Sequence, residues 1–278
     1  MTSTINYARY LGYNSVAAAI VFTILYVPLL AWFLFQLTRG RSRILIILSV
    51  FCAIRIAAFA IRAVLCHSSS AGEDLGLVIA DQVLFSVGFF GLLYGAYGLV
   101  MDRSVCFIEL GKLDKCDYEP ENPISRLTGN RNLFRLVLLV AVILGSVGTS
   151  KSTDFSNSDD IQTGKALHEA SIIIFLILTV LQTLQTVVLI RCERRDSEYT
   201  ELTATSAGAK YGAFIFVAIS LLLLIREAFV TATLGNQSQQ SNEQLWYPLI
   251  TLTEFLCVVL FTTPGLIPPK GDVKELPR

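Results

Sequence analysis

The chain has 278 residues, of which 53% are hydrophobic and 16% are charged; its formal net charge is zero and its mean hydropathy is +0.59. Soluble domains carry roughly 25% charged residues, so this composition excludes an ordinary soluble protein and indicates one that lies in a membrane. The balanced charge provides no basic field, so we expect no nucleic-acid partner.

Seven apolar runs follow one another along the chain, each near the ~20 residues that a helix needs to cross a bilayer. The residues before the first run lack the basic region and cleavage site of a signal peptide, so we interpret this run as a true span. Runs such as LLLLI and IIIFLIL do not alternate as barrel strands do. The sequence therefore predicts an all-α seven-transmembrane helix bundle, with spans at about Val16–Leu37, Ile44–Cys66, Leu75–Met101, Leu133–Thr149, Ala166–Ile190, Tyr211–Leu234 and Trp246–Ile267.

The spans form one transmembrane domain over residues 1–267, which a proline-rich stop separates from a short tail, residues 268–278. Lys and Arg gather in the connections after the first, third and fifth spans, whereas the other three connections are nearly free of them. The positive-inside rule then predicts an outside N-terminus and a cytoplasmic C-terminus. Asn236, in an Asn-Gln-Ser glycosylation sequon, falls in a predicted outer connection.

Charged residues inside the apolar runs are the strongest pointer to function. An ionised group in hydrocarbon costs about 2.5–3.5 kcal/mol on insertion scales, so such residues face the interior of a helix bundle and find partners there. Here the second span contains Arg55 and Arg62, and the third contains Asp81. The sixth span contains Arg226 and Glu227, and the seventh contains Glu254.

Helical spacing places Arg55 and Arg62 on one face of the second span, and it places Asp81 on the stripe formed by glycines 88, 91, 95 and 98 of the third. At ~1.5 Å of rise per residue, Arg62 is level with Asp81 and Arg226 is level with Glu254, so we expect these two ion pairs. No acid is expected at the depth of Arg55, which must then meet water, a backbone carbonyl or a ligand. The glycine stripe is expected to let a neighbouring backbone approach closely.

These charged groups gather in the predicted outer half of the membrane, which favours a polar pocket that faces outward. A purely structural role, in which ion pairs only hold helices in register, fits the sequence equally well. The ligand-binding candidates are Arg55, Arg62, Asp81, Glu169 at the mouth of the fifth span, Arg226, Glu227 and Glu254.

The sequence carries no pattern for metal, cofactor or covalent chemistry, so we expect no catalytic residues, no metal and no cofactor. His67 and His168 are the only histidines, and neither lies in an HxxxH or HExxH motif. The spans lack the buried lysine that a retinal Schiff base requires. Nucleotide-binding glycine patterns are also missing from the sequence.

Three stretches carry a resemblance to known membrane proteins: LVIADQVLFSVGFFGLLYGAYGLVMDR, LLLLIREAF and WYPLITLTEF. The first resembles a fungal family of seven-helix proteins of unknown function. That family is similar in plan to the fungal lipid-translocating exporter-like family, which is linked to resistance to toxic sterols and sphingoid bases. The chain ends its last span with PGLIPP, where the exporter-like family tends to have His-Pro-Gly. The resemblance implies a fungal protein of the plasma membrane or an endomembrane.

Three hypotheses for function follow. In the first, the pocket binds or translocates a lipid-like amphiphile. In the second, the protein is a receptor whose basic loop after the third span engages a cytoplasmic partner. The third, an intramembrane enzyme that uses Asp81 and Glu254 as acid and base, is the weakest. Membrane lipids are partners under all three.

The orientation is testable by cysteine accessibility. In a variant free of native cysteines, Ser158→Cys should react with a membrane-impermeant thiol reagent in intact cells, because Ser158 lies in a predicted outer connection. Ser125→Cys, in the connection after the third span, is the matched control and should react only after permeabilisation. The reverse pattern would overturn the predicted topology.

Overall fold

The computed structural model describes residues 6–40, 42–109, 130–152, 158–195, 207–240 and 242–267. Within these residues every regular element is a helix, and seven helices are long and apolar enough to cross a membrane. Six of them are continuous: α2 (Val16–Arg39), α3 (Arg43–His67), α5 (Leu75–Glu109), α7 (Arg131–Ser152), α8 (Ser158–Arg195) and α10 (Ala207–Ala232). The seventh joins α12 (Glu243–Trp246), the π-helix η2 (Tyr247–Thr251) and α13 (Leu252–Phe261). The seven-helix membrane bundle is thus confirmed.

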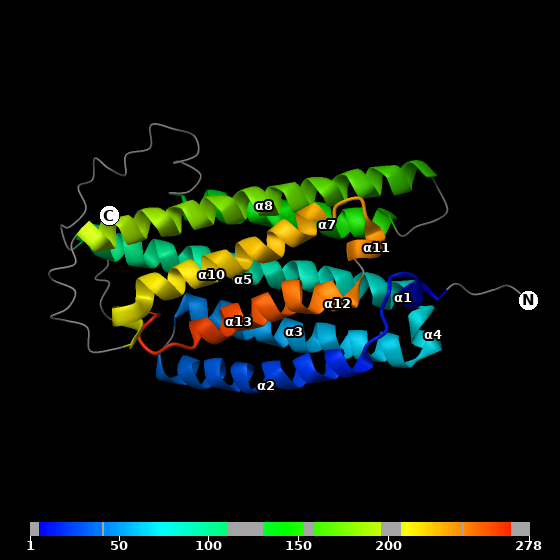
Figure 1. The fold of residues 1–278 in the computed structure, drawn as a ribbon, viewed down its shortest axis with the longest axis horizontal. Coiled ribbons are helices and arrows are strands. Elements are labelled where there is room, and N and C mark those ends of the chain that lie inside the picture. The colour runs from blue at the N-terminus through cyan, green and yellow to red at the C-terminus, as the bar shows by residue number, and fades with distance from the viewer. Residues whose placement is uncertain are drawn as a thin grey trace, which may run out of the picture.

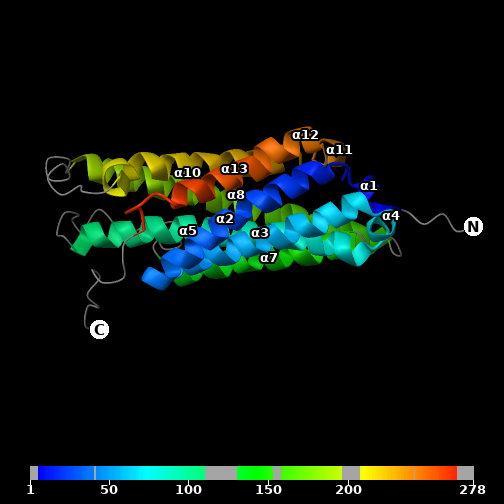
Figure 2. The same ribbon diagram turned by 90° about the horizontal axis from the view of Figure 1, so that it is seen from below.

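The long helices run alongside one another in an elongated bundle (Figures 1 and 2). Three short helices, α1 (Tyr7–Tyr10), α4 (Ser69–Gly72) and α11 (Gln237–Gln240), lie at one end, here called the cap end. The helices α2, α5 and α8 finish at the other end, here called the basic end because their last turns lead into the Lys- and Arg-rich connections. Helix α5 packs against α3, α7, α8 and α10, which places it at the centre of the bundle.

The helix bounds differ from the predicted spans mainly where a helix continues beyond its apolar run. Helix α5 extends to Glu109, and α8 reaches from Ser158 to Arg195, because charged residues end a hydrophobic run but do not end a helix. The last helix is shorter than predicted and ends at Phe261 instead of Ile267. Pro264 disfavours a helical conformation for the residue before it, and Gly265 turns the chain with a φ of 81°.

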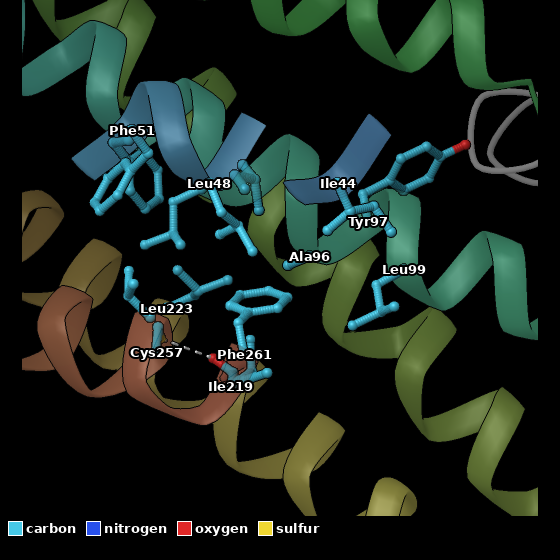
Figure 3. Close-up of a cluster of buried hydrophobic side chains, with 14 of the residues drawn as sticks. Ile44, Leu48, Phe51, Ala96, Tyr97, Leu99, Ile219, Leu223, Cys257 and Phe261 are labelled. Carbon is cyan, nitrogen blue, oxygen red and sulfur yellow. Dashed lines mark hydrogen bonds between the residues drawn. The ribbon is translucent and has the colours of Figure 1, made fainter. Parts of the chain in front are cut away.

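The core of the basic half is apolar. Figure 3 shows its side chains pointing toward one another between the helices. They are Ile44, Leu48 and Phe51 of α3, Ala96, Tyr97 and Leu99 of α5, Ile219 and Leu223 of α10, and Cys257 and Phe261 of α13. Lipid tails are as apolar as these side chains, so close van der Waals packing holds the helices together more than the hydrophobic effect does.

Glycines bring α7 and α8 into the closest backbone contact. A Cβ atom on Gly148 would lie 2.6 Å from the backbone nitrogen of His168, and one on Gly164 would lie 2.5 Å from that of Ser152. The sequence placed such an approach on the glycine stripe of α5, and this was wrong. There a Cβ on Gly88 would meet the Arg55 guanidinium at 2.9 Å, whereas Gly98 has nothing within 4 Å.

This difference predicts opposite outcomes for two identical substitutions. Gly148→Ala should force α7 and α8 apart and destabilise the protein by about 1–3 kcal/mol, the usual cost of overpacking. Gly98→Ala fills open space, so it should leave stability unchanged or raise it through helix propensity. Thermal unfolding of both variants in one detergent compares them; a Gly148→Ala melting temperature at or above that of Gly98→Ala would contradict the α7–α8 contact.

Candidate functional site

Six of the seven candidate residues come together in the interior of the bundle. Arg55 and Arg62 project from α3, Asp81 from α5, Arg226 and Glu227 from α10, and Glu254 from α13. Their exposed fractions range from 0 to 9%. Four helices therefore contribute to one buried set of ionic groups, here called the charge network.

Glu254 is the centre of the deeper part of the network. Its Oε2 atom lies 2.6 Å from Nη2 of Arg55, and its Oε1 atom lies 3.3 Å from Nε of Arg226. Arg226 also pairs with its neighbour in sequence, Glu227. The expected pair of Arg226 with Glu254 is thus confirmed. The four groups form a row of alternating sign, Arg55, Glu254, Arg226 and Glu227.

The expectation that no acid reaches Arg55 was wrong. It rested on a seventh span that begins at Trp246, whereas the helix begins at Glu243. Glu254 is eleven residues after Glu243, and Arg55 is twelve residues before His67, the last residue of α3. The two residues therefore lie at nearly the same depth from the cap end.

Between Trp246 and Glu254 the seventh helix contains the five-residue π-helix η2, with Pro248 inside it. Such wide turns frequently occur at functional sites. Here the turn separates Trp246, whose ring contacts Arg62, from Glu254, which contacts Arg55.

The second part of the network lies nearer the cap end. Nη2 of Arg62 is 3.4 Å from Oδ2 of Asp81, which confirms the other expected ion pair. The Arg62 guanidinium also lies over three aromatic rings, at 3.7 Å from the centroid of Trp246, 4.2 Å from Tyr13 and 4.9 Å from Phe85. Cation–π contacts of this kind stabilise an arginine that has left water.

Tyr13 precedes the first span and closes this group. Its phenol interacts electrostatically with both Arg62 and Asp81. Burial raises the pKa of the phenol above its ordinary value, so Tyr13 is a neutral hydroxyl at physiological pH.

Aromatic rings also enclose the deeper arginines. The Arg55 guanidinium lies 4.6 Å from the centroid of Phe85 and 5.0 Å from that of Phe51, and its Nη2 donates to the carbonyl of Phe85 at 3.2 Å. Arg226 lies 3.7 Å from the ring centroid of Phe89. Gly88 provides the space under the Arg55 guanidinium, which gives this glycine a function in the site and not only in packing.

The network does not use all of its hydrogen-bonding groups. Among the groups of the described residues, Nε and Nη1 of Arg55, Nε of Arg62 and Oε2 of Glu227 are buried without a hydrogen-bond partner. Unpartnered buried polar atoms are costly, and in native proteins they call for an explanation such as a bound molecule or a functional role.

Glu169 does not join the network. It is exposed on the outer surface of α8, on the same stripe as Ile173 and Ile177, which are 48% and 51% exposed. The buried stripe of α8 instead carries Ser171 and Phe175. Asn236 is exposed at the start of α11, at the cap end.

Sequence reasoning missed the aromatic contacts of the network. Tyr13 and Trp246 lie at the edges of predicted spans, where aromatic residues are ordinary interface anchors, so no signal in the sequence singled them out. The described residues contain no group of three or more His, Cys, Asp or Glu side chains that could hold a metal ion. The basic connection proposed for a cytoplasmic partner, residues 110–129, lies outside the described residues, as does the tail 268–278.

The shared carboxylate predicts a characteristic stability pattern. Glu254→Gln leaves Arg55 and Arg226 without their common counter-charge, which should cost on the order of 3–5 kcal/mol. Adding Arg55→Gln removes one of the two unpaired cations. The double variant should therefore lose less unfolding free energy than the two single variants lose in sum. Glu169→Gln, on the exposed stripe of α8, is the matched control and should melt like the parent. Strictly additive losses would argue against the Arg55–Glu254 pair.

Comparison with known proteins identifies a family of unknown function. No curated protein and no solved structure matches the chain. One family matches over residues 12–199, a stretch that covers the first five spans and the Arg55, Arg62 and Asp81 part of the charge network. The chain therefore belongs to the family described as a domain of unknown function (DUF7702).

Proposed function

We propose that the protein binds the polar head of a lipid-like amphiphile at the charge network while the apolar part of the molecule stays among the membrane-facing helices. One observation carries this proposal. Arg55 lies at the middle of the bundle with two donor atoms, Nε and Nη1, that no described protein group accepts. A head group with acceptor oxygens would satisfy them.

The charge balance of the network favours a particular class of head group. Three arginines face three carboxylates, so the network needs no net charge from a ligand. It offers donors at Arg55 and an acceptor at Glu227 in the same row. A zwitterionic or neutral polar head matches both, whereas a purely anionic head would add an uncompensated charge in a medium of low dielectric constant.

The apolar cluster of the basic half supports entry from the cap end. Side chains of α3, α5, α10 and α13 fill the bundle on the basic side of the network (Figure 3). A polar head that reaches Arg55 from the cap end passes Arg62 and Asp81, which lie nearer that end. With the predicted orientation, this is the outer side of the membrane.

A receptor is the alternative, and two contacts at the basic end favour it. At the basic end, Arg103 of α5 packs against Gly212 and lies 5.3 Å from the ring centroid of Phe216, both on α10. Asp102 beside it pairs with Arg131 of α7 at 2.6 Å. Three helices thus meet next to the basic connection, where a cytoplasmic partner would sense their movement. An enzyme that uses Asp81 and Glu254 has less support, because both acids are engaged by arginines.

A lysine at position 55 tests the binding proposal. Arg55→Lys keeps a positive charge beside Glu254 but loses the Nε and Nη1 donors. The protein should still fold, with a lower melting temperature because lysine stacks less well on Phe51 and Phe85. Binding of a fluorescent short-chain phosphatidylcholine to the protein in detergent should weaken about ten-fold, as expected when one or two hydrogen bonds of about 0.5–1.5 kcal/mol each are lost.

Arg135→Lys is the matched control, since Arg135 is exposed on α7. Its affinity for the probe should equal that of the parent. If Arg55→Lys binds the probe as tightly as the control, the Arg55 donors have no part in binding and the proposal fails. Transfer of the bound probe between the leaflets of a liposome without any partner would distinguish a translocator from a receptor.

A further inference from the structure

The chain before the first span folds back across the cap end of the bundle. Residues 6–15, here called the N-terminal strap, contain helix α1 and lead directly into α2. The strap contacts α3, α4 and α5 (Figures 1 and 2). Nothing in a hydropathy pattern requires this arrangement, because a polar leader before a first span has no apolar face that must be buried.

Two polar contacts hold the ends of the strap. At its C-terminal end, Oε1 of Glu243 accepts hydrogen bonds from the backbone nitrogens of Asn14 at 2.9 Å and Ser15 at 3.2 Å. At its N-terminal end, Nδ2 of Asn6 donates to the carbonyl of Ser69 at 3.4 Å. The strap is thus tied to the start of the seventh helix and to α4.

Between these ties the strap presents apolar side chains to the bundle. Ala8 and Tyr13 form a small cluster with Leu65 of α3 and Val78 of α5, separate from the main core. Val78 is fully buried by this contact, with 0% exposure. Val78 lies one helical turn before Asp81, so the strap covers the helix face that carries the acid.

Tyr13 extends the cover to the ionic groups themselves. Its ring lies under the Arg62 guanidinium at 4.2 Å, and its phenol interacts with Arg62 and Asp81 together. A ligand head that enters from the cap end meets this phenol before it meets the ion pair.

We propose that the N-terminal strap is a lid on the charge network, in which Tyr13 occupies the outer position of the site until an amphiphile displaces it. The lid covers Arg62 and Asp81 in the closed state, and release of the Glu243 tie lets it lift. Its role as a gate for the ligand rests on the binding function proposed above, whereas its opening and closing do not.

Few interactions hold the strap against the bundle, so the strap can lift at a modest cost in free energy. The buried part of the strap is a single small apolar cluster, and its ties are hydrogen bonds at the edge of the bundle. Segments with few buried apolar contacts and solvent-exposed hydrogen bonds open at a lower free energy than a helical core does. The Arg62–Asp81 pair remains intact under the lid, so opening exposes a preformed ionic site.

Opening is measurable without any ligand. In a variant free of native cysteines, Val78→Cys places a thiol beneath the strap, where a water-soluble thiol reagent reaches it only when the strap lifts. Glu243→Ala removes both hydrogen bonds to the strap backbone, and bonds to an ionised group are the stronger kind, so the labelling rate should rise about ten-fold or more. Glu169→Ala, an exposed carboxylate on α8, is the control and should not change the rate.

Hydrogen exchange gives a second measurement that needs no reporter residue. Backbone amides of residues 8–13 should exchange at least several-fold faster in Glu243→Ala than in Glu169→Ala, while those of the α3 core should not change. Equal labelling and equal exchange in the two variants would overturn the lid, because the Glu243 tie would then have no effect on the strap.

Locking the strap tests its role as a gate. A Cβ on Gly72 would lie 3.1 Å from Cγ of Asn6, so Asn6→Cys with Gly72→Cys should form a disulfide in the cysteine-free background. Oxidation should slow association of the fluorescent phosphatidylcholine at least ten-fold, and reduction should restore it. An unchanged association rate in the oxidised protein would overturn the gate.

The two proposals fail separately. If Arg55→Lys leaves binding unchanged but Glu243→Ala accelerates labelling of the thiol at position 78, the lid stands and the assignment of the head-group site falls. If Arg55→Lys weakens binding but the locked and unlocked proteins bind at the same rate, the site stands and the lid as a gate falls.

Discussion

One carboxylate, Glu254, determines how the bundle can be assembled. An ionised arginine in the interior of a membrane protein is costly without a counter-charge, and Arg55 and Arg226 reach the same acid from different helices. The contact fixes the rotation of α3, α10 and α13 about their own axes, because any of the three that turned away would leave a charge unpaired. The second ion pair, between Arg62 and Asp81, does the same for α3 and α5. Apolar packing between helices is far less selective, since lipid competes for it.

Aromatic residues stabilise the buried arginines of this ionic assembly through cation–π contacts. Each of the three buried arginines lies against at least one ring, and Phe85 serves both arginines of α3. Phe85 in turn packs edge to face against Phe59 and Trp246, so the rings connect the ion pairs to the packing of α2, α3 and the seventh helix. The backbone-to-backbone contact of α7 with α8, in contrast, depends on Gly148 and Gly164, and the ion pair beside it, Lys151 with Asp160, is exposed. The bundle thus combines two different modes of helix association.

The sequence predicted the fold better than it predicted the site. Helix length and hydropathy are properties of one segment at a time, so all seven spans were found. The predicted bounds were wrong only where a helix extends beyond its apolar run or ends before Pro264. The two expected ion pairs were also correct, because depth and face follow from helical geometry. To predict the pairing of Arg55 with Glu254, one must know where the seventh helix begins. Hydropathy puts this start too late, at Trp246, because Glu243 is polar. Glu169 lies apart from the other candidates because it is on the exposed face of α8, and the face of this residue was not compared with the buried one. The position of Tyr13 could not be predicted, since it depends on a polar leader folding back over the bundle.

The equal number of buried acids and bases has an electrical consequence. A charge that moves through the whole membrane field changes the free energy by about 2.3 kcal/mol per 100 mV. The charge network carries three positive and three negative groups, so a displacement of the whole set along the membrane normal does no net electrical work. Any rearrangement of the helices that moves the six groups together is therefore indifferent to the membrane potential. Such a concerted movement would not respond to a change in membrane voltage, even though it would carry three arginines and three carboxylates along the membrane field.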